Sequence, residues 1–239
     1  MAKGNWRDSI GRSLLGILEM EGVESFLRTA TEALSVNPRG GYKLKAQFVG
    51  EICEIVLIGL TAKYLSVTNR KAKIFQSVVL KDLNNPKSDF RTELDAVLVT
   101  PYFLLTTECK SYAGAIRVTD NCTLNHKDMS ADVFAQSKLH VDKLKLYAKQ
   151  LVTPNQGLVN PPVFANVFVF SNASIEDRRT TIGKRSLTVT TASNIMGYYE
   201  EMFKRYNVPV YDYERACKIM QACSDSKKLH AQHAKYLGY

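Results

Sequence analysis

Two short segments of the sequence carry residues that could act together in catalysis. Asp95 closes the tetrapeptide TELD, and Glu108 and Lys110 flank Cys109 in the tetrapeptide TECK. Both segments have the composition of β-strands, in which successive side chains point to opposite faces. Glu108 and Lys110 are therefore expected on one face, with Cys109 on the other. If the two strands are neighbours, two carboxylates and a lysine gather at one place.

This combination suits hydrolysis of a phosphodiester bond. The strands around it are otherwise apolar, and a charged group in a central strand is costly unless it is paired or bound to a metal. Two carboxylates favour a hard divalent cation, Mg²⁺ or Mn²⁺, over zinc. A lysine beside them can orient or help deprotonate water, or neutralise charge on a scissile phosphate. Spacing alone also permits an exposed cross-strand ion pair of Glu108 and Lys110.

The strands that must position these residues follow from hydrophobic patterning. Residues 93–99 and 103–110 are predicted strands that flank a turn at Thr100-Pro101-Tyr102, since proline cannot donate within a central ladder. The short connection makes them antiparallel neighbours. Further strands are predicted at residues 73–80, 163–170 and 187–191.

Helical periodicity accounts for most of the remaining chain. Predicted helices cover residues 1–35 with an interruption at Gly22, then 47–65, 130–151, 193–206, and 211–237 with a break near Ser224. Ser130 is the expected N-cap of the third of these helices. The order of elements predicts an α/β fold, in which a mixed central sheet is flanked by helices.

The turn-forming sequence NPRGG at residues 37–41 divides the chain. We expect an N-terminal helical extension at residues 1–40, the main α/β domain at 41–206, and a C-terminal helical extension at 207–239. The N-terminal helices are a candidate surface for homodimerisation, which would suit an enzyme that cuts two strands.

Composition favours a nucleic-acid partner and excludes other classes. The formal charge of the 239 residues is +9, and a basic surface attracts a phosphate polyanion. No apolar run approaches the roughly 20 residues that span a bilayer, and no signal peptide is recognised, so we expect no membrane association. Five scattered cysteines are poor material for a disulfide framework and suit a reducing cytoplasm.

Several segments, taken in order, resemble the nuclease-related domain (NERD), a branch of the PD-(D/E)XK nuclease superfamily. They are a helix that carries Gly50, Glu51 and Glu54, the strand TELDAVLV, and the segment LTTECKSYAG. The resemblance continues into DVFAQSK at residues 132–138 and the apolar strand at 163–170, and covers roughly residues 47–195. The proline that names the superfamily is absent before Asp95, where Leu94 stands.

The resemblance implies roles for particular residues. Asp95 and Glu108 would be metal ligands, together with the backbone carbonyl of Cys109, and Lys110 would be the catalytic lysine. A glutamate on the first helix of the domain, Glu51 or Glu54, would complete the acidic cluster. These two share a helix face, and the sequence does not choose between them. Gln136 would support the site from its helix by positioning water or substrate.

Other polar residues are candidates for contacts with nucleic acid. A polar stripe on the predicted helix at residues 130–151 consists of Gln136, His140, Lys143 and Tyr147. It either faces the catalytic centre or is solvated. In the first case Lys138 and Lys143 would lie near the phosphate backbone. We favour the solvated interpretation for His140 and Lys143. A basic loop either grips phosphates or is simply solvated, and it contains Arg178, Arg179, Lys184 and Arg185.

Together these features predict a Mg²⁺- or Mn²⁺-dependent nuclease that acts on DNA in preference to RNA, with endonuclease activity favoured. Two alternatives remain open. One is a non-catalytic nucleic-acid-binding module that keeps the fold, although retention of the complete Asp95, Glu108 and Lys110 set argues against it. The other is an RNase with the same site.

Overall fold

The computed structural model describes residues 5–35, 42–85, 88, 90–111, 116–119, 124–126, 129–131, 133–153, 160–170, 175–177 and 187–236. Its centre is a five-stranded mixed sheet with the order β1-β2-β3-β7-β9. The strands are β1 (Lys73–Lys81), β2 (Arg91–Val99), β3 (Leu104–Ser111), β7 (Val163–Phe170) and β9 (Thr188–Thr191). β1, β2 and β3 run antiparallel, whereas β3, β7 and β9 are parallel. The predicted α/β class and the β2–β3 hairpin are confirmed.

A second, smaller sheet was not predicted. It has the order β6-β5-β4-β8 and consists of β4 (Ile116–Val118), β5 (Leu124–His126), β6 (Met129–Ala131) and β8 (Ile175–Asp177). Ser130 pairs with Asn125 inside this sheet, and the helix α4 (Val133–Leu151) begins only afterwards. The prediction that Ser130 caps this helix is therefore wrong, because strand pairing keeps the chain extended through that position.

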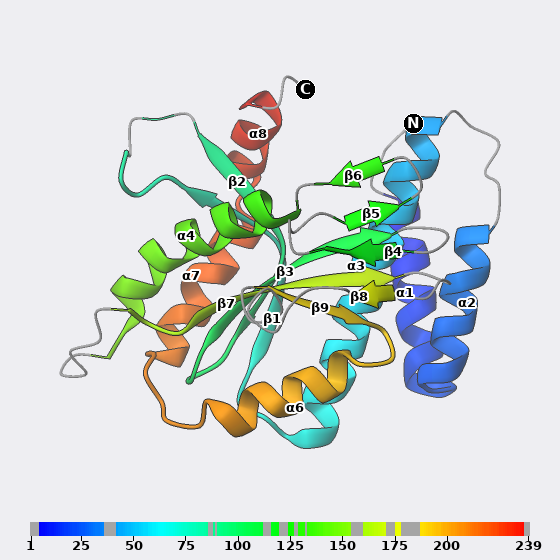
Figure 1. Ribbon diagram of the computed structural model, residues 1–239, viewed down its shortest axis with the longest axis horizontal. Helices are drawn as coiled ribbons and strands as arrows, with labels where there is room; N and C mark the ends of the chain where they lie inside the picture. Colours follow the sequence, from blue (N-terminus) through cyan, green and yellow to red (C-terminus); the bar gives the residue numbers. More distant parts are fainter. Residues whose placement is uncertain are drawn as a thin grey trace.

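Helices cover both faces of the main sheet (Figure 1). α3 (Tyr42–Thr68) and α6 (Ile195–Arg205) pack with side chains such as Leu98 and Leu105 on one face. α4 and α7 (Tyr213–Asp225) pack with Val97 and Leu104 on the other. α8 (Lys227–Tyr236) follows α7 after a break at Ser226, close to the predicted position, and contacts β2 and β1.

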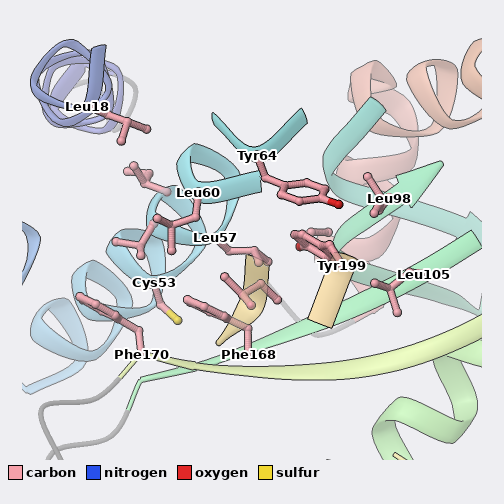
Figure 2. Close-up of a cluster of buried hydrophobic side chains, with 14 of the residues drawn as sticks. Leu18, Cys53, Leu57, Leu60, Tyr64, Leu98, Leu105, Phe168, Phe170 and Tyr199 are labelled. Atoms are coloured by element: carbon pink, nitrogen blue, oxygen red, sulfur yellow. The ribbon is translucent and has the colours of Figure 1, made fainter. Parts of the chain in front are cut away.

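The largest hydrophobic core lies between α3 and the sheet (Figure 2). Leu57 and Leu60 of α3 are fully buried against strand residues such as Phe168. α6 closes this layer with Tyr199, whose hydroxyl is hydrogen-bonded to that of Thr61 at 2.8 Å. α3 is thus a buried helix with a fixed position, and any polar residue on its sheet-facing side is held rigidly as well.

The N-terminal helices α1 (Asn5–Met20) and α2 (Val23–Ser35) form a pair that packs against α3 (Figure 1). The turn between them contains Gly22 at φ +89°, a conformation that favours glycine and accounts for the predicted interruption. Gly59 permits the close approach to α3, because a Cβ there would lie 2.9 Å from Phe26 Cζ. No helix in the described ranges is long and apolar enough to cross a bilayer.

Candidate active site

The main sheet forks where the candidate catalytic residues lie. Regular pairing between β2 and β3 extends from Val99–Leu104 only as far as Ala96–Thr107. Beyond that point β2 remains paired with β1, and β3 remains paired with β7 up to Ser111. The two strands therefore separate at the next positions along the register, which are Asp95 and Glu108.

A local distortion of β1 and β2 accompanies the fork. Gln76 pairs with Ala96 and Val78 with Leu94, but Ser77 and Asp95 between them are not regularly paired. Ser77 has a φ of +50°, which is uncommon for a residue other than glycine. Leu94 packs in the core under α4 and α7, whereas Ala96 packs in the core under α3, so the alternation of side chains is interrupted here. Asp95 occupies the interruption.

Asp95 substitutes for the missing strand pairing. Its Oδ2 accepts a hydrogen bond of 2.7 Å from the backbone N–H of Cys109. Burial raises the pKa of Asp95 well above its ordinary value, and the negative charges of Glu108 and Glu54 raise the pKa further. The Cys109 N–H and the Lys110 ammonium partly oppose this rise. Three carboxylates from three different elements thus act on one another at the fork.

Glu108 and Lys110 lie on the same face of β3, as their spacing predicts. Lys110 Nζ donates to Glu108 Oε1 at 2.6 Å and lies 3.4 Å from Gln136 Oε1 on α4. The Glu108 side chain is only 4% exposed, so the alternative of an exposed ion pair on a solvated face is wrong. The Lys110 side chain is 22% exposed and therefore remains accessible from solvent.

His140 also belongs to this site, although the sequence favoured a solvated position for it. Its side chain is buried, and Nδ1 lies 3.4 Å from Glu108 Oε2. Burial lowers the pKa of His140, and nearby Lys110 lowers it further while Glu108 opposes the change. The solvated interpretation of His140 is therefore wrong. Its spacing of four residues from Gln136 was the available signal, because residues at i and i+4 share a helix face.

Glu54 is the α3 glutamate that acts on Asp95. It accepts a hydrogen bond of 2.7 Å from Gln76 Nε2, and its charge contributes to the raised pKa of Asp95. Gln76 belongs to β1, so this contact joins α3 to the strand beside β2. Glu51 lies one turn earlier on α3 and is half-buried. Glu54 thus extends the acidic cluster at the fork.

The acidic fork fits a magnesium-type ion. In the part of the chain that the structure describes, no three His, Cys, Asp or Glu side chains are already arranged around one metal position. Magnesium, however, is usually held by one or two carboxylates and keeps several waters. Glu108 Oε2 makes no hydrogen bond with a described residue, and Asp95 is surrounded by like charge. Both features are those of carboxylates that a cation would stabilise.

The residues predicted to contact nucleic acid have different surroundings. Lys138 is exposed on α4 and pairs with Asp142 at 2.7 Å. Lys143 is largely buried and pairs with Asp82 at 2.8 Å, so its predicted solvated position is wrong. The basic loop with Arg178, Arg179, Lys184 and Arg185 lies outside the described residues.

Comparison with protein families found a match in the central part of the chain. Residues 57–171 match the family model described as "Nuclease-related domain" (NERD), which confirms the resemblance predicted from the sequence. Asp95, Glu108, Lys110 and Gln136 lie within the matched segment, whereas Glu54 lies just before it.

Among solved structures, protein VC1899 from Vibrio cholerae is 11% identical, with a TM-score of 0.38. The match covers 83% of this chain and 50% of VC1899, so the chain spans half the length of that protein. A search of curated proteins found no match.

Proposed function

We propose that this chain is a divalent-metal-dependent nuclease whose active site is the fork between β2 and β3. One observation carries the proposal. Asp95 and Glu108 meet where the strands separate, and the ammonium of Lys110 lies 2.6 Å from Glu108. The nuclease-related domain match spans these three residues and supports the same conclusion.

Asp95 and Glu108 would hold the cation, together with the backbone carbonyl of Cys109. Mg²⁺ or Mn²⁺ bound there would polarise a phosphoryl oxygen and lower the pKa of its water. The hydrogen bond from the Cys109 N–H fixes Asp95 Oδ2, so the other carboxylate oxygen would be the one to bind the cation. Glu54 adds negative charge that strengthens cation binding.

Lys110 would act on the reacting groups. Its Nζ is oriented by Glu108 Oε1 at 2.6 Å and Gln136 Oε1 at 3.4 Å, and from this position it would act on a water or on a phosphate oxygen. Gln136 is exposed and would position water or substrate from α4. His140 would support Glu108 from the opposite side, because Nδ1 lies 3.4 Å from Oε2. Each proposed role thus has a contact that orients the side chain.

We propose DNA as the substrate, with endonuclease action favoured, since the net charge of +9 suits a polyanion. Lys138, Lys143 and the basic loop are the proposed phosphate contacts. Lys143 would have to exchange its partner Asp82 for a phosphate, which makes Lys138 the stronger candidate. An RNase that uses the same site is the second candidate.

A digestion panel tests the proposal. Purified protein is incubated with duplex DNA, single-stranded DNA and RNA, each with Mg²⁺, Mn²⁺ or EDTA. We expect DNA cleavage that requires the metal and is abolished by Lys110→Ala. The matched control is Lys149→Ala, because Lys149 is an exposed lysine of α4 away from the fork. Cleavage that persists in EDTA or in Lys110→Ala overturns the mechanism.

The panel also decides between the alternatives. Binding of nucleic acid without cleavage under every metal condition would favour the non-catalytic module. Cleavage of RNA alone would assign an RNase.

We further propose that residues 1–40 and 207–239 are helical extensions of the catalytic unit at 41–206, that α1 and α2 mediate homodimerisation, and that the protein acts in the cytoplasm. Sedimentation of the full chain tests the dimer.

A further inference from the structure

A cavity of about 640 Å³ lies beside α4, at the edge of the sheet formed by β7 and β9. β9 pairs with β7 only from Asn166 to Val169, so residues 163–165 of β7 have no strand on that side. α4 and α6 line the space that β9 leaves open. The cavity therefore arises from the shortness of β9, and its volume lies within the roughly 300–1,000 Å³ of small-molecule sites.

One wall of the cavity is aromatic. Phe164 and Tyr206 contribute to it, with ring centroids 4.6 Å apart and planes inclined by 42°. The guanidinium of Arg205 lies 5.6 Å from the centroid of the Tyr206 ring. Aromatic faces of this kind stack on nucleic-acid bases without regard to sequence, and arginine adds a cation–π contribution.

The cavity also offers cations from opposite sides. Lys138 and Lys145 come from α4, and Arg205 comes from α6. Two acids, Asp142 and Glu201, are present as well, but Asp142 is already paired with Lys138 at 2.7 Å. Lys145 and Arg205 therefore flank the aromatic wall as two positive groups on different elements, an arrangement that suits a bound phosphate.

Buried polar groups complete the lining. Ser137 is 3% exposed, and its hydroxyl has no hydrogen-bond partner among the residues that the structure describes. A buried hydroxyl without a partner is costly, and such groups commonly bind a ligand or a water. Burial raises the pKa of Tyr198 to about 12, and its hydroxyl is hydrogen-bonded to Thr188. These hydroxyls can donate to and accept from the edge of a base.

We propose that this cavity is a nucleotide subsite, in which a base packs on Phe164 and Tyr206 while its phosphate lies between Lys145 and Arg205. The inference rests on the proposed function and extends it, since it assigns an unpaired nucleotide to the substrate. The chemistry recognised is a base joined to a phosphate. That ligand is supplied either by a single strand or by a free nucleotide.

The cavity adjoins the fork through two elements. Ser137 directly follows Gln136, which contacts Lys110. On the sheet, Ala165 of the cavity pairs with Thr106, two residues before Glu108. Two residues of strand correspond to about 7 Å, so this end of the cavity lies near Glu108. A nucleotide in the cavity would therefore place an adjoining phosphate near the acidic fork.

The test is calorimetric titration of the full chain in EDTA with dAMP, deoxyadenosine, 2-deoxyribose 5-phosphate and single-stranded hexadeoxyadenylate. Wild type is compared with Lys145→Glu, Arg205→Glu and Val141→Phe, the last of which fills the cavity without changing charge. Lys149→Glu is the matched control, because it makes the same charge change one turn further along α4, outside the cavity. The melting temperature of each variant establishes that it is folded.

We expect dAMP to bind with one site per chain and more tightly than either of its fragments. Lys145→Glu, Arg205→Glu and Val141→Phe should each weaken dAMP binding by at least about fivefold, whereas Lys149→Glu should change it by less than about twofold. If a single strand is the source, the hexamer binds at least about tenfold more tightly than dAMP and loses affinity in the same variants. Equal affinity for dAMP and for the hexamer would identify a free nucleotide as the ligand.

Three results overturn the subsite: no saturable dAMP binding up to about 10 mM, equal effects of Lys145→Glu and Lys149→Glu, or unchanged affinity in folded Val141→Phe. Because the titration is done without metal, it is independent of cleavage. Nucleotide binding by a protein that does not cut DNA would support the subsite and contradict the proposed nuclease function. Cleavage by a protein whose cavity variants bind dAMP normally would support the nuclease function and contradict the subsite.

Discussion

Asp95→Asn should make this protein more stable and at the same time inactive. In the folded chain the Asp95 carboxylate is partly buried. Its desolvation and the negative charges of Glu108 and Glu54 together raise its pKa. An asparagine removes the charge but keeps an oxygen that can accept the hydrogen bond from the Cys109 N–H. The substitution thus removes an unfavourable interaction while it conserves the contact that shapes the fork.

The expected gain in the free energy of unfolding is about 0.5–2 kcal/mol, the size of a typical single stabilising substitution. For a chain of this length, about 1 kcal/mol corresponds to about 2–4 °C in Tm. Asp95→Asn should therefore melt about 1–8 °C above wild type in EDTA. Asp142→Asn is the matched control, because Asp142 is half-exposed and pairs with Lys138 on the surface of α4. Its Tm should change by no more than about 2 °C.

The sign of the pH dependence follows from the raised pKa. A carboxyl group with a higher pKa in the folded state than in the unfolded state binds protons on folding, so its charge destabilises the fold above the unfolded value of about 3.9. The penalty grows as the pH rises toward the folded pKa and vanishes below the unfolded pKa. The difference in Tm between Asp95→Asn and wild type should therefore be larger at pH 7.5 than at pH 5.

Divalent metal should make wild type more stable than Asp95→Asn. A ligand at 100 times its dissociation constant stabilises the folded state by about 2.7 kcal/mol. Mn²⁺ should therefore raise the Tm of wild type and leave that of Asp95→Asn almost unchanged. Differential scanning fluorimetry with a Mn²⁺ titration measures both effects. A variant that melts below wild type in EDTA, or that gains as much from Mn²⁺ as wild type does, would refute the electrostatic account of the fork.

Two further predictions concern residues that hold the site in place. His140→Leu removes the imidazole whose Nδ1 lies 3.4 Å from Glu108 Oε2. It should lower the cleavage rate about tenfold or more and cost about 1–3 kcal/mol in urea unfolding, and an unchanged rate would exclude a role for His140. Gly59→Val should destabilise the chain by about 1–3 kcal/mol, because its side chain would collide with Phe26 and displace the α1–α2 pair. Limited proteolysis should then release the N-terminal helices first, and uniform cleavage along the chain would contradict this placement.

The sequence predicted the parts of the fold that depend on long, regular patterns. The apolar run at residues 163–170 and the hairpin around Pro101 were recognised because burial and turn chemistry both act on neighbouring residues. The small second sheet was missed because its strands have only three residues each, too few for periodicity to register. Its pairing of β4 with β8 joins segments nearly 60 residues apart, which no local pattern can reveal.

The candidate site, too, was predicted only where it depends on a local pattern. The shared face of Glu108 and Lys110 followed from strand alternation alone. The position of Asp95 depends on the distortion at Ser77, which has a φ of +50°. The sequence gives no sign of this conformation, because the residue is not a glycine. His140 was misjudged because a polar stripe at helical spacing looks the same whether it faces solvent or a buried carboxylate. The deciding quantity was burial, which depends on how α4 sits on β3.

The fork explains how the proposed catalytic centre can exist inside an otherwise regular sheet. Continued pairing of β2 and β3 would place Asp95 opposite Glu108 and bury both charges in the ladder. Separation of the strands leaves the Cys109 N–H without a backbone partner, and the Asp95 carboxylate accepts its hydrogen bond instead. The cores under α3 and under α4 and α7 hold the strands on each side of the fork, and they stabilise an arrangement of charges that is unfavourable by itself. Because those two layers fix the fork without a cation, the proposed metal ligands are preorganised, and metal binding should relieve repulsion without remodelling the backbone.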